Sequence, residues 1–138
     1  MLQFVFVLVV VCVSTQTTVN AEEYPPAELL EMLQPIHDYC AKEIGVSEDV
    51  LKNYDIDTKD HNVMCYMMCF MKQSNWMTMD GEIKFDFIVA NPWEPIRHII
   101  IANVNKCRDI EHDEDECVLV YNFAKCIHDV DEEHWFLP

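Results

Sequence analysis

The first 21 residues are mostly apolar and carry no charged side chain. An uninterrupted apolar run extends from Phe4 to Val13, and the segment ends in Val19-Asn20-Ala21, a small-x-small pattern typical of a signal peptidase site. Ten apolar residues are about half of what a membrane-spanning helix requires. We therefore predict that residues 1–21 are a secretory signal peptide and that residues 22–138 form one compact domain.

In the remainder of the chain, apolar residues recur at helical intervals of three and four. The clearest helix is predicted from about Pro26 to Ile44, with Gly45 as a left-handed cap and a kink or break at Pro35. The chain has only two glycines, which argues against a turn-rich β architecture. The further predicted helices are Glu48–Asn53 behind Ser47, Asp60–Ser74, Phe85–Ala90, one from Pro92–Pro95 to Cys107, and Glu114–His128.

The charge is strongly acidic, because 25 Asp and Glu residues face only 9 Lys and Arg residues, for a net charge of −16. Such a chain repels phosphate backbones and anionic lipid surfaces, so we expect no nucleic-acid partner, no stable membrane insertion and no membrane-lytic role. The acidic stretch from Asp109 to Glu116 is interpreted as a solvated loop and helix cap. A calcium loop is the less favoured alternative, because the stretch lacks the glycine of a sharp calcium-binding turn.

Seven cysteines are present, and Cys12 would leave with the signal peptide. Zinc sites usually combine closely spaced Cys and His pairs, whereas only Cys65 and Cys69 are near one another here. An exported domain of this size favours disulfides instead. The six cysteines predicted to form them are Cys40, Cys65, Cys69, Cys107, Cys117 and Cys126.

Helical geometry excludes two of the pairs. Cys65 and Cys69 are four apart on one helix, with Cβ atoms roughly 6 Å apart, too far for a disulfide. Cys117 and Cys126 lie on opposite faces of the last helix. Of the 15 pairings, three contain the first pair, three the second and one both, so ten remain open.

Four features of the sequence resemble one protein family. They are the cysteine spacing C-x24-C-x3-C-x37-C-x9-C-x8-C, the Cys65–Cys69 centre, the Glu43-Ile44-Gly45-Val46 segment and the Met79-Asp80-Gly81 turn. The family is the six-cysteine pheromone/general odorant-binding family of insects, and the match covers nearly all of residues 22–138. The resemblance implies a compact bundle of six helices around an internal apolar pocket. It also implies one pairing: Cys40 with Cys69, Cys65 with Cys117, and Cys107 with Cys126.

Methionines are abundant, and their flexible side chains suit an adaptable pocket. Met64, Met68 and Met71 form a helical stripe that spacing alone favours as ordinary core. The resemblance instead implies that this helix lines the cavity. A hydroxyl such as that of Tyr66 or Tyr121 could add selectivity. The remaining candidate ligand-binding residues of the helical region are Trp76, Ile83, Phe87, Val120, Phe123, Ala124 and Ile127.

The segment after Cys126 ends in an apolar cluster, His134 to Pro138, that follows a polar run. Burial of these residues is favourable, and the cluster resembles the tail that covers the pocket in shorter family members. We therefore predict that Trp135, Phe136 and Leu137 form a wall of the pocket. His128 and His134 lie near several carboxylates, so acidification could change how the tail is held; the alternative is exposed histidines with no such role.

The resulting functional expectation is a non-enzymatic carrier for small hydrophobic odorants or pheromones, which takes them through aqueous sensillar lymph to chemosensory receptors. The expected partners are an apolar ligand and either an olfactory receptor or a second copy of the chain, with no cofactor and no metal. One alternative is a carrier in haemolymph, the reproductive tract or saliva. The other is a small secreted hydrolase, for which His37-Asp38 and His128-Asp129 are the nearest candidates, without a nucleophile motif.

Overall fold

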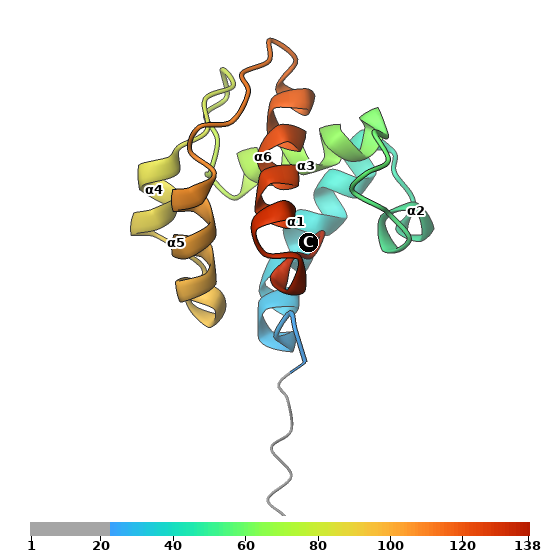
Figure 1. The fold of residues 1–138 in the computed structure, drawn as a ribbon. Helices are drawn as coiled ribbons and strands as arrows, with labels where there is room; N and C mark the ends of the chain where they lie inside the picture. Colours follow the sequence, from blue (N-terminus) through green and yellow to red (C-terminus); the bar gives the residue numbers. More distant parts are fainter. Residues whose placement is uncertain (1–22) are drawn as a thin grey trace, which may run out of the picture.

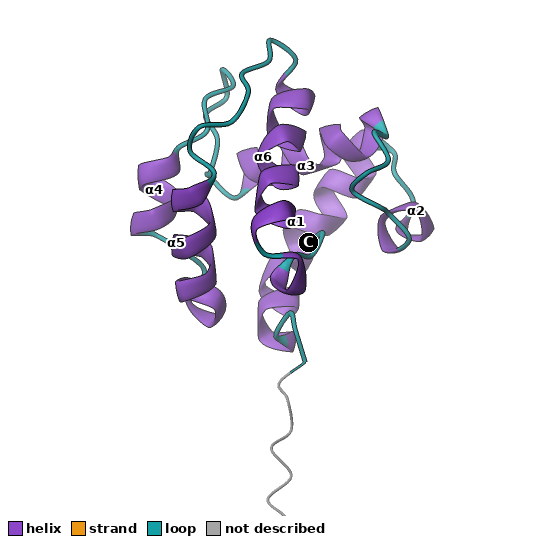
Figure 2. Cartoon of the chain, viewed as in Figure 1, coloured by secondary structure: helices purple, strands orange, loops and turns teal. Residues whose placement is uncertain are grey.

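The computed structural model describes residues 23–138, so the predicted signal peptide lies outside the described residues. Within the described part, the chain forms six α-helices and no β-strand, which confirms the all-α prediction (Figures 1 and 2). The helices are α1 (Ala27–Ile44), α2 (Glu48–Lys52), α3 (His61–Gln73), α4 (Phe85–Ala90), α5 (Arg97–Lys106) and α6 (Glu116–Val130). Two short 3-10 helices, η1 (Glu94–Ile96) and η2 (Glu132–His134), precede α5 and follow α6.

The helix ends follow the capping residues of the sequence. The Ser47 hydroxyl accepts a hydrogen bond from the backbone N–H of Val50, and the Asp60 carboxylate accepts two at the start of α3. Gly45 ends α1 in the left-handed conformation, with φ 77°. The last helix begins two residues later than predicted, because Asp115 is its N-cap and accepts from the N–H of Cys117.

Pro35 does not interrupt α1, so the break that we allowed at this position does not occur. Leu29 and Leu33 before the proline and Cys40 after it are all buried against the same core. Tertiary packing on both sides of Pro35 therefore holds the helix together despite the missing backbone hydrogen bond.

Three disulfides join the helices in the pairing that the family resemblance implied. Cys40–Cys69 joins α1 to α3, Cys65–Cys117 joins α3 to α6, and Cys107–Cys126 joins the end of α5 to α6. The Cα–Cα distances are 5.7, 4.6 and 5.8 Å, within the range of ordinary disulfides. The cross-links therefore fix both the position and the rotation of α3.

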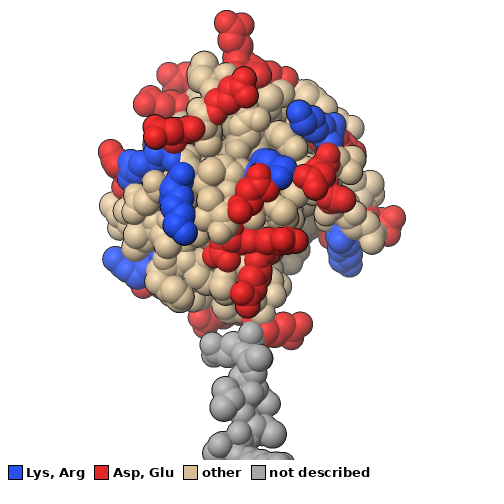
Figure 3. Space-filling view, in the orientation of Figure 1, with Lys and Arg blue, Asp and Glu red and all other residues tan. Residues whose placement is uncertain are grey.

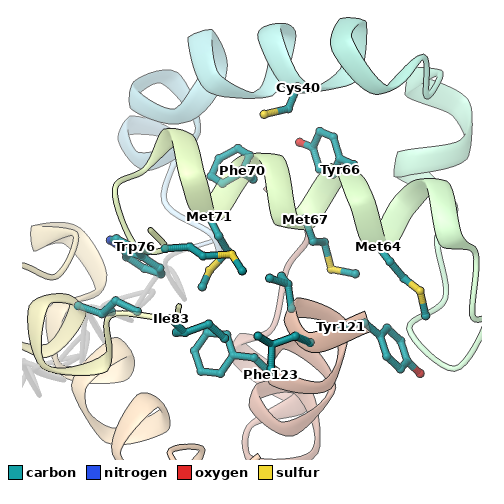
Figure 4. Close-up of a cluster of buried hydrophobic side chains, with 14 of the residues drawn as sticks. Cys40, Met64, Tyr66, Met67, Phe70, Met71, Trp76, Ile83, Tyr121 and Phe123 are labelled. Atoms are coloured by element: carbon teal, nitrogen blue, oxygen red, sulfur yellow. The ribbon is translucent and has the colours of Figure 1, made fainter. Parts of the chain in front are cut away.

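Helix α3 runs through the centre of the molecule, between α1 and α6 (Figure 4). Tyr66 and Phe70 point toward α1, whereas Met64, Met67 and Met71 point toward α6. Helices α4 and α5 pack against each other on the other side of α6 (Figure 1). This arrangement places α3, α5 and α6 around the interior of the bundle.

The surface carries the acidic excess, and Figure 3 shows carboxylates spread widely over the visible face. None of the helices described is both long enough and apolar enough to cross a membrane.

A candidate ligand cavity

An apolar cavity of about 140 Å³ lies between α3, α5, α6 and the C-terminal tail. Aromatic rings form much of its wall. Trp76 and Trp93 are stacked with ring centroids 4.2 Å apart, and Phe70 meets Trp93 edge-on at 6.4 Å. The complete lining is Tyr24, Met67, Phe70, Met71, Ser74, Trp76, Trp93, Ile96, Ile99, Ile100, Asn103, Val104, Val120, Phe123, Ala124, Ile127 and His134–Pro138.

Few polar side chains reach this wall. The Ser74 hydroxyl is buried and has no hydrogen-bond partner within residues 23–138. The buried amide of Asn103 donates to Asp131 at 3.0 Å. Burial raises the pKa of Tyr24 to about 12, with a further contribution from the Asp131 carboxylate, so this phenol is neutral at physiological pH. The cavity therefore offers mainly apolar contact, together with the buried and unpaired hydroxyl of Ser74.

The C-terminal tail closes one side of the cavity. Asp131 connects the tail to α5, because one carboxylate oxygen accepts from Asn103 and the other lies 2.8 Å from Nδ1 of His134. Tyr24 packs edge-on against His134 and Phe136, with centroid distances of 5.0 and 5.8 Å. These contacts hold the predicted tail wall in position over the cavity.

The end of the tail is also bonded to the helices. The Tyr66 hydroxyl donates to the main-chain oxygen of Pro138. Nδ1 of His37 lies 2.7 Å from the same hydroxyl, and its Nε2 lies 2.6 Å from a carboxylate oxygen of Glu48. Burial raises the pKa of Tyr66 far above its ordinary value, so the phenol keeps the proton that it donates. A hydrogen-bonded chain from α2 through α1 and α3 thus ends on the tail.

Most of the predicted ligand-binding residues lie at this cavity. Nine of the 13 are part of its lining: Met71, Trp76, Val120, Phe123, Ala124, Ile127, Trp135, Phe136 and Leu137.

The other four candidates lie elsewhere. On α3 the cavity-facing stripe is Met67, Phe70, Met71 and Ser74, because the two disulfides of α3 fix its rotation. Met64 is buried in the core beside Tyr121 (Figure 4). Met68 is half-buried and is not part of the lining.

Ile83 and Phe87 are also absent from the wall. Ile83 pairs with Met77 in an isolated β-bridge, and the Phe87 ring lies 4.3 Å from the ammonium of Lys84. The turn and α4 are displaced from the cavity because η1 and α5 occupy that side with their own apolar residues.

Both hydroxyls suggested for ligand contact are already bonded within the protein. Tyr121 donates to the carbonyl of Ile56 at 3.0 Å, and Tyr66 donates to Pro138. Neither residue is part of the lining. The buried hydroxyl of Ser74 therefore remains as a candidate for a hydrogen bond to the ligand.

Sequence reasoning missed about half of the wall. The apolar positions of α5 predicted the helix, but nothing in their spacing showed that they line a cavity. Tyr24 and Trp93 lie outside any periodic segment. The missed lining residues are Tyr24, Met67, Phe70, Ser74, Trp93, Ile96, Ile99, Ile100, Asn103, Val104, His134 and Pro138.

The pairs considered for hydrolysis do not form a catalytic arrangement. His37 contacts Tyr66 and Glu48, while Asp38 accepts from Gln34. His128 lies 3.2 Å from Asp129 and packs against the Trp135 ring. No serine or cysteine nucleophile contacts either histidine in the hydrogen bonds of the described chain.

One group of potential metal ligands occurs in the described residues: His61, Cys65 and Cys117, whose ligand atoms lie within 4.8 Å of one another. The two sulfur atoms are joined in a disulfide and are therefore not thiolate ligands. In the oxidised protein this cluster is a cross-link with a neighbouring imidazole.

A disulfide-linked helical bundle around an apolar cavity is the architecture of a small-ligand binding protein. The chain belongs to the PBP/GOBP family, whose model matches residues 22–130. Odorant binding protein 5 of Apis mellifera has a similar fold, with a TM-score of 0.68 and 24% identity over 80% of this chain and 95% of that one. An odorant-binding protein of Locusta migratoria aligns with the same TM-score and identity over 78% of this chain and 84% of its own.

Proposed function

We propose that this protein is a secreted carrier that binds small hydrophobic odorants or pheromones and transports them through aqueous lymph to chemosensory receptors. The observation that carries the proposal is the apolar cavity between α3, α5 and α6 with the tail as its fourth wall. Membership in the PBP/GOBP family supports a binding role rather than catalysis. Export rests on the predicted signal peptide, residues 1–21.

The size of the cavity limits the ligand. A dry cavity of about 150 Å³ holds a molecule of the size of benzene, and this one has about 140 Å³. A longer odorant requires Met67 and Met71 to change rotamer or the tail to move outward. Methionine suits that adjustment, because its unbranched side chain repacks easily.

Affinity in such a site comes mainly from the apolar surface that ligand and wall remove from water, at about 25 cal/mol per Å². The stacked Trp76 and Trp93 rings present flat apolar faces, and the unpaired Ser74 hydroxyl offers one hydrogen bond. We infer that the preferred ligands are small and apolar with one alcohol, aldehyde or ester group.

The direct test is displacement of a fluorescent apolar probe, N-phenyl-1-naphthylamine, by a panel of short alcohols, esters and fatty acids. The proposal requires displacement by at least one class in a size-dependent order. A probe that binds but is displaced by no member of the panel would contradict the proposed ligand class. Immunolocalisation then separates sensillar lymph from haemolymph, the reproductive tract or saliva as the place of action.

A further inference from the structure

The disulfide between Cys65 and Cys117 has a histidine and a carboxylate beside it. Nδ1 of His61 lies 3.7 Å from Sγ of Cys65, and Nε2 of the same ring lies 2.9 Å from a carboxylate oxygen of Asp115. The two sulfur atoms and a ring nitrogen of His61 are all within 4.8 Å of one another. Within residues 23–138, neither of the other two disulfides has a His, Asp or Glu side chain in such a group.

This site is accessible from solvent. The side chains of His61 and Asp115 are 61% and 44% exposed, and Cys65 is only partly buried. Cys117, by contrast, is buried, with a relative exposure of 7%. A small thiol therefore reaches the Cys65 sulfur more easily than the Cys117 sulfur.

Cys117 is in turn suited to leave as a thiolate. It is the second residue of the 15-residue helix α6, and Asp115 accepts a hydrogen bond from its N–H at 2.8 Å. A helix N-terminus lowers the pKa of a cysteine thiol, and a thiol of lower pKa is the faster leaving group in exchange. The His61 ring, held by Asp115 through Nε2, presents its Nδ1 to the sulfur pair.

We propose that Cys65–Cys117 is a thiol-exchange site for small extracellular thiols of the glutathione class. The incoming thiolate attacks Sγ of Cys65, a new S–S bond forms there, and the bond to Cys117 breaks. Cys117 leaves with the electron pair and takes a proton from Nδ1 of His61. The product is a mixed disulfide on Cys65 and a free thiol on Cys117.

Exchange at this position acts on the cavity, because it releases α3 from α6 and both helices form the cavity wall. The proposal does not depend on the identity of the ligand or on a carrier role. The charged groups around His61 are Asp115 from α6 and Asp60 at the start of its own helix, and only Asp115 contacts the ring.

The test exposes the folded chain to glutathione, stops the reaction with acid, alkylates free thiols and maps the peptides by mass spectrometry. We expect glutathione on Cys65 and the alkyl group on Cys117 while the other two disulfides are still intact. His61→Gln should slow this step about tenfold at pH 6, because it removes the ring nitrogen that lies beside the sulfur pair.

His98→Gln is the matched control, because His98 is exposed on α5 and none of the hydrogen bonds of the described chain involves it. Its rate should equal that of the native chain. The rate at which Cys40–Cys69 opens in the same samples serves as an internal reference. If a variant is destabilised as a whole, glutathione should open all of its disulfides faster. Earlier or equal opening of another disulfide, glutathione on Cys117, or an unchanged rate in His61→Gln at pH 6 would overturn the proposal.

Discussion

The proposed function gives Ser74 a specific role in ligand choice. Its buried hydroxyl has no partner in the described part of the chain, and it lies on the cavity stripe of α3. Ser74→Ala should weaken binding of a primary alcohol by about 1 kcal/mol, the net value of one hydrogen bond. Binding of the hydrocarbon of equal length should not change. Isothermal titration of the two ligands checks this, and an equal loss for both would show that Ser74 acts only through packing.

Tyr66 holds the end of the tail to the bundle. Tyr66→Phe removes the hydroxyl that donates to Pro138 and contacts His37, and leaves that oxygen only the longer 3.4 Å contact with Nδ1 of His37. We expect the free energy of unfolding to fall by about 1–3 kcal/mol, measured by urea denaturation. Tyr54→Phe is the matched control, because the Tyr54 hydroxyl is buried without a partner among residues 23–138 and its removal should cost almost nothing. Equal losses in both variants would contradict this role for Tyr66.

At the scale of elements, the tail is held by an aspartate whose pKa is shifted. Hydrogen bonds from Asn103 and, secondly, from His134 hold the pKa of Asp131 below its usual range. A carboxylate with a depressed pKa in the folded state stabilises that state above the ordinary value of about 3.9 and loses the effect as pH falls further. Nδ1 of His134 lies 2.8 Å from this carboxylate, so the tail keeps the contact as long as Asp131 is ionised.

We therefore expect acidification to pH 5 to leave the tail in place, and acidification below about pH 4 to weaken its attachment. Probe affinity should be similar at pH 7.5 and 5 and lower at pH 3.5. In the Asp131→Asn variant, the loss of probe affinity below pH 4 should be smaller than in the native chain. A marked loss of affinity already at pH 5 would instead support the histidine switch considered from the sequence.

The sequence predicted the elements better than it predicted their rotation. Capping by Ser47, Asp60 and Gly45 is a local property, so the positions of α1 to α3 followed from sequence. The face that α3 turns to the cavity depends on disulfides to two other helices, and of the predicted Met64–Met68–Met71 stripe only Met71 lies in the lining. The choice of α5 over α4 as a wall likewise depends on tertiary packing, which no local spacing encodes.

For the molecule as a whole, three disulfides stabilise a small domain that contains a cavity. Cys65–Cys117 spans 52 residues of sequence and Cys107–Cys126 spans 19. Because loop-closure entropy grows with loop length, removing the first pair by double alanine substitution should cost about 1 kcal/mol more than removing the second. Denaturant titration of the two variants tests this, and a larger loss from the shorter loop would contradict the entropic explanation.

If the interior of this bundle binds the ligand, a side chain that fills the cavity must weaken binding. Ala124 lines the cavity from α6, so Ala124→Phe places a ring in much of its 140 Å³. Met68→Phe is the matched control, because it introduces the same side chain on α3 at a position outside the lining. We expect fluorescence titration with N-phenyl-1-naphthylamine to show at least about a tenfold loss of affinity for Ala124→Phe and native affinity for Met68→Phe. Native affinity in a folded Ala124→Phe variant would place the ligand outside this cavity and contradict the proposed binding site.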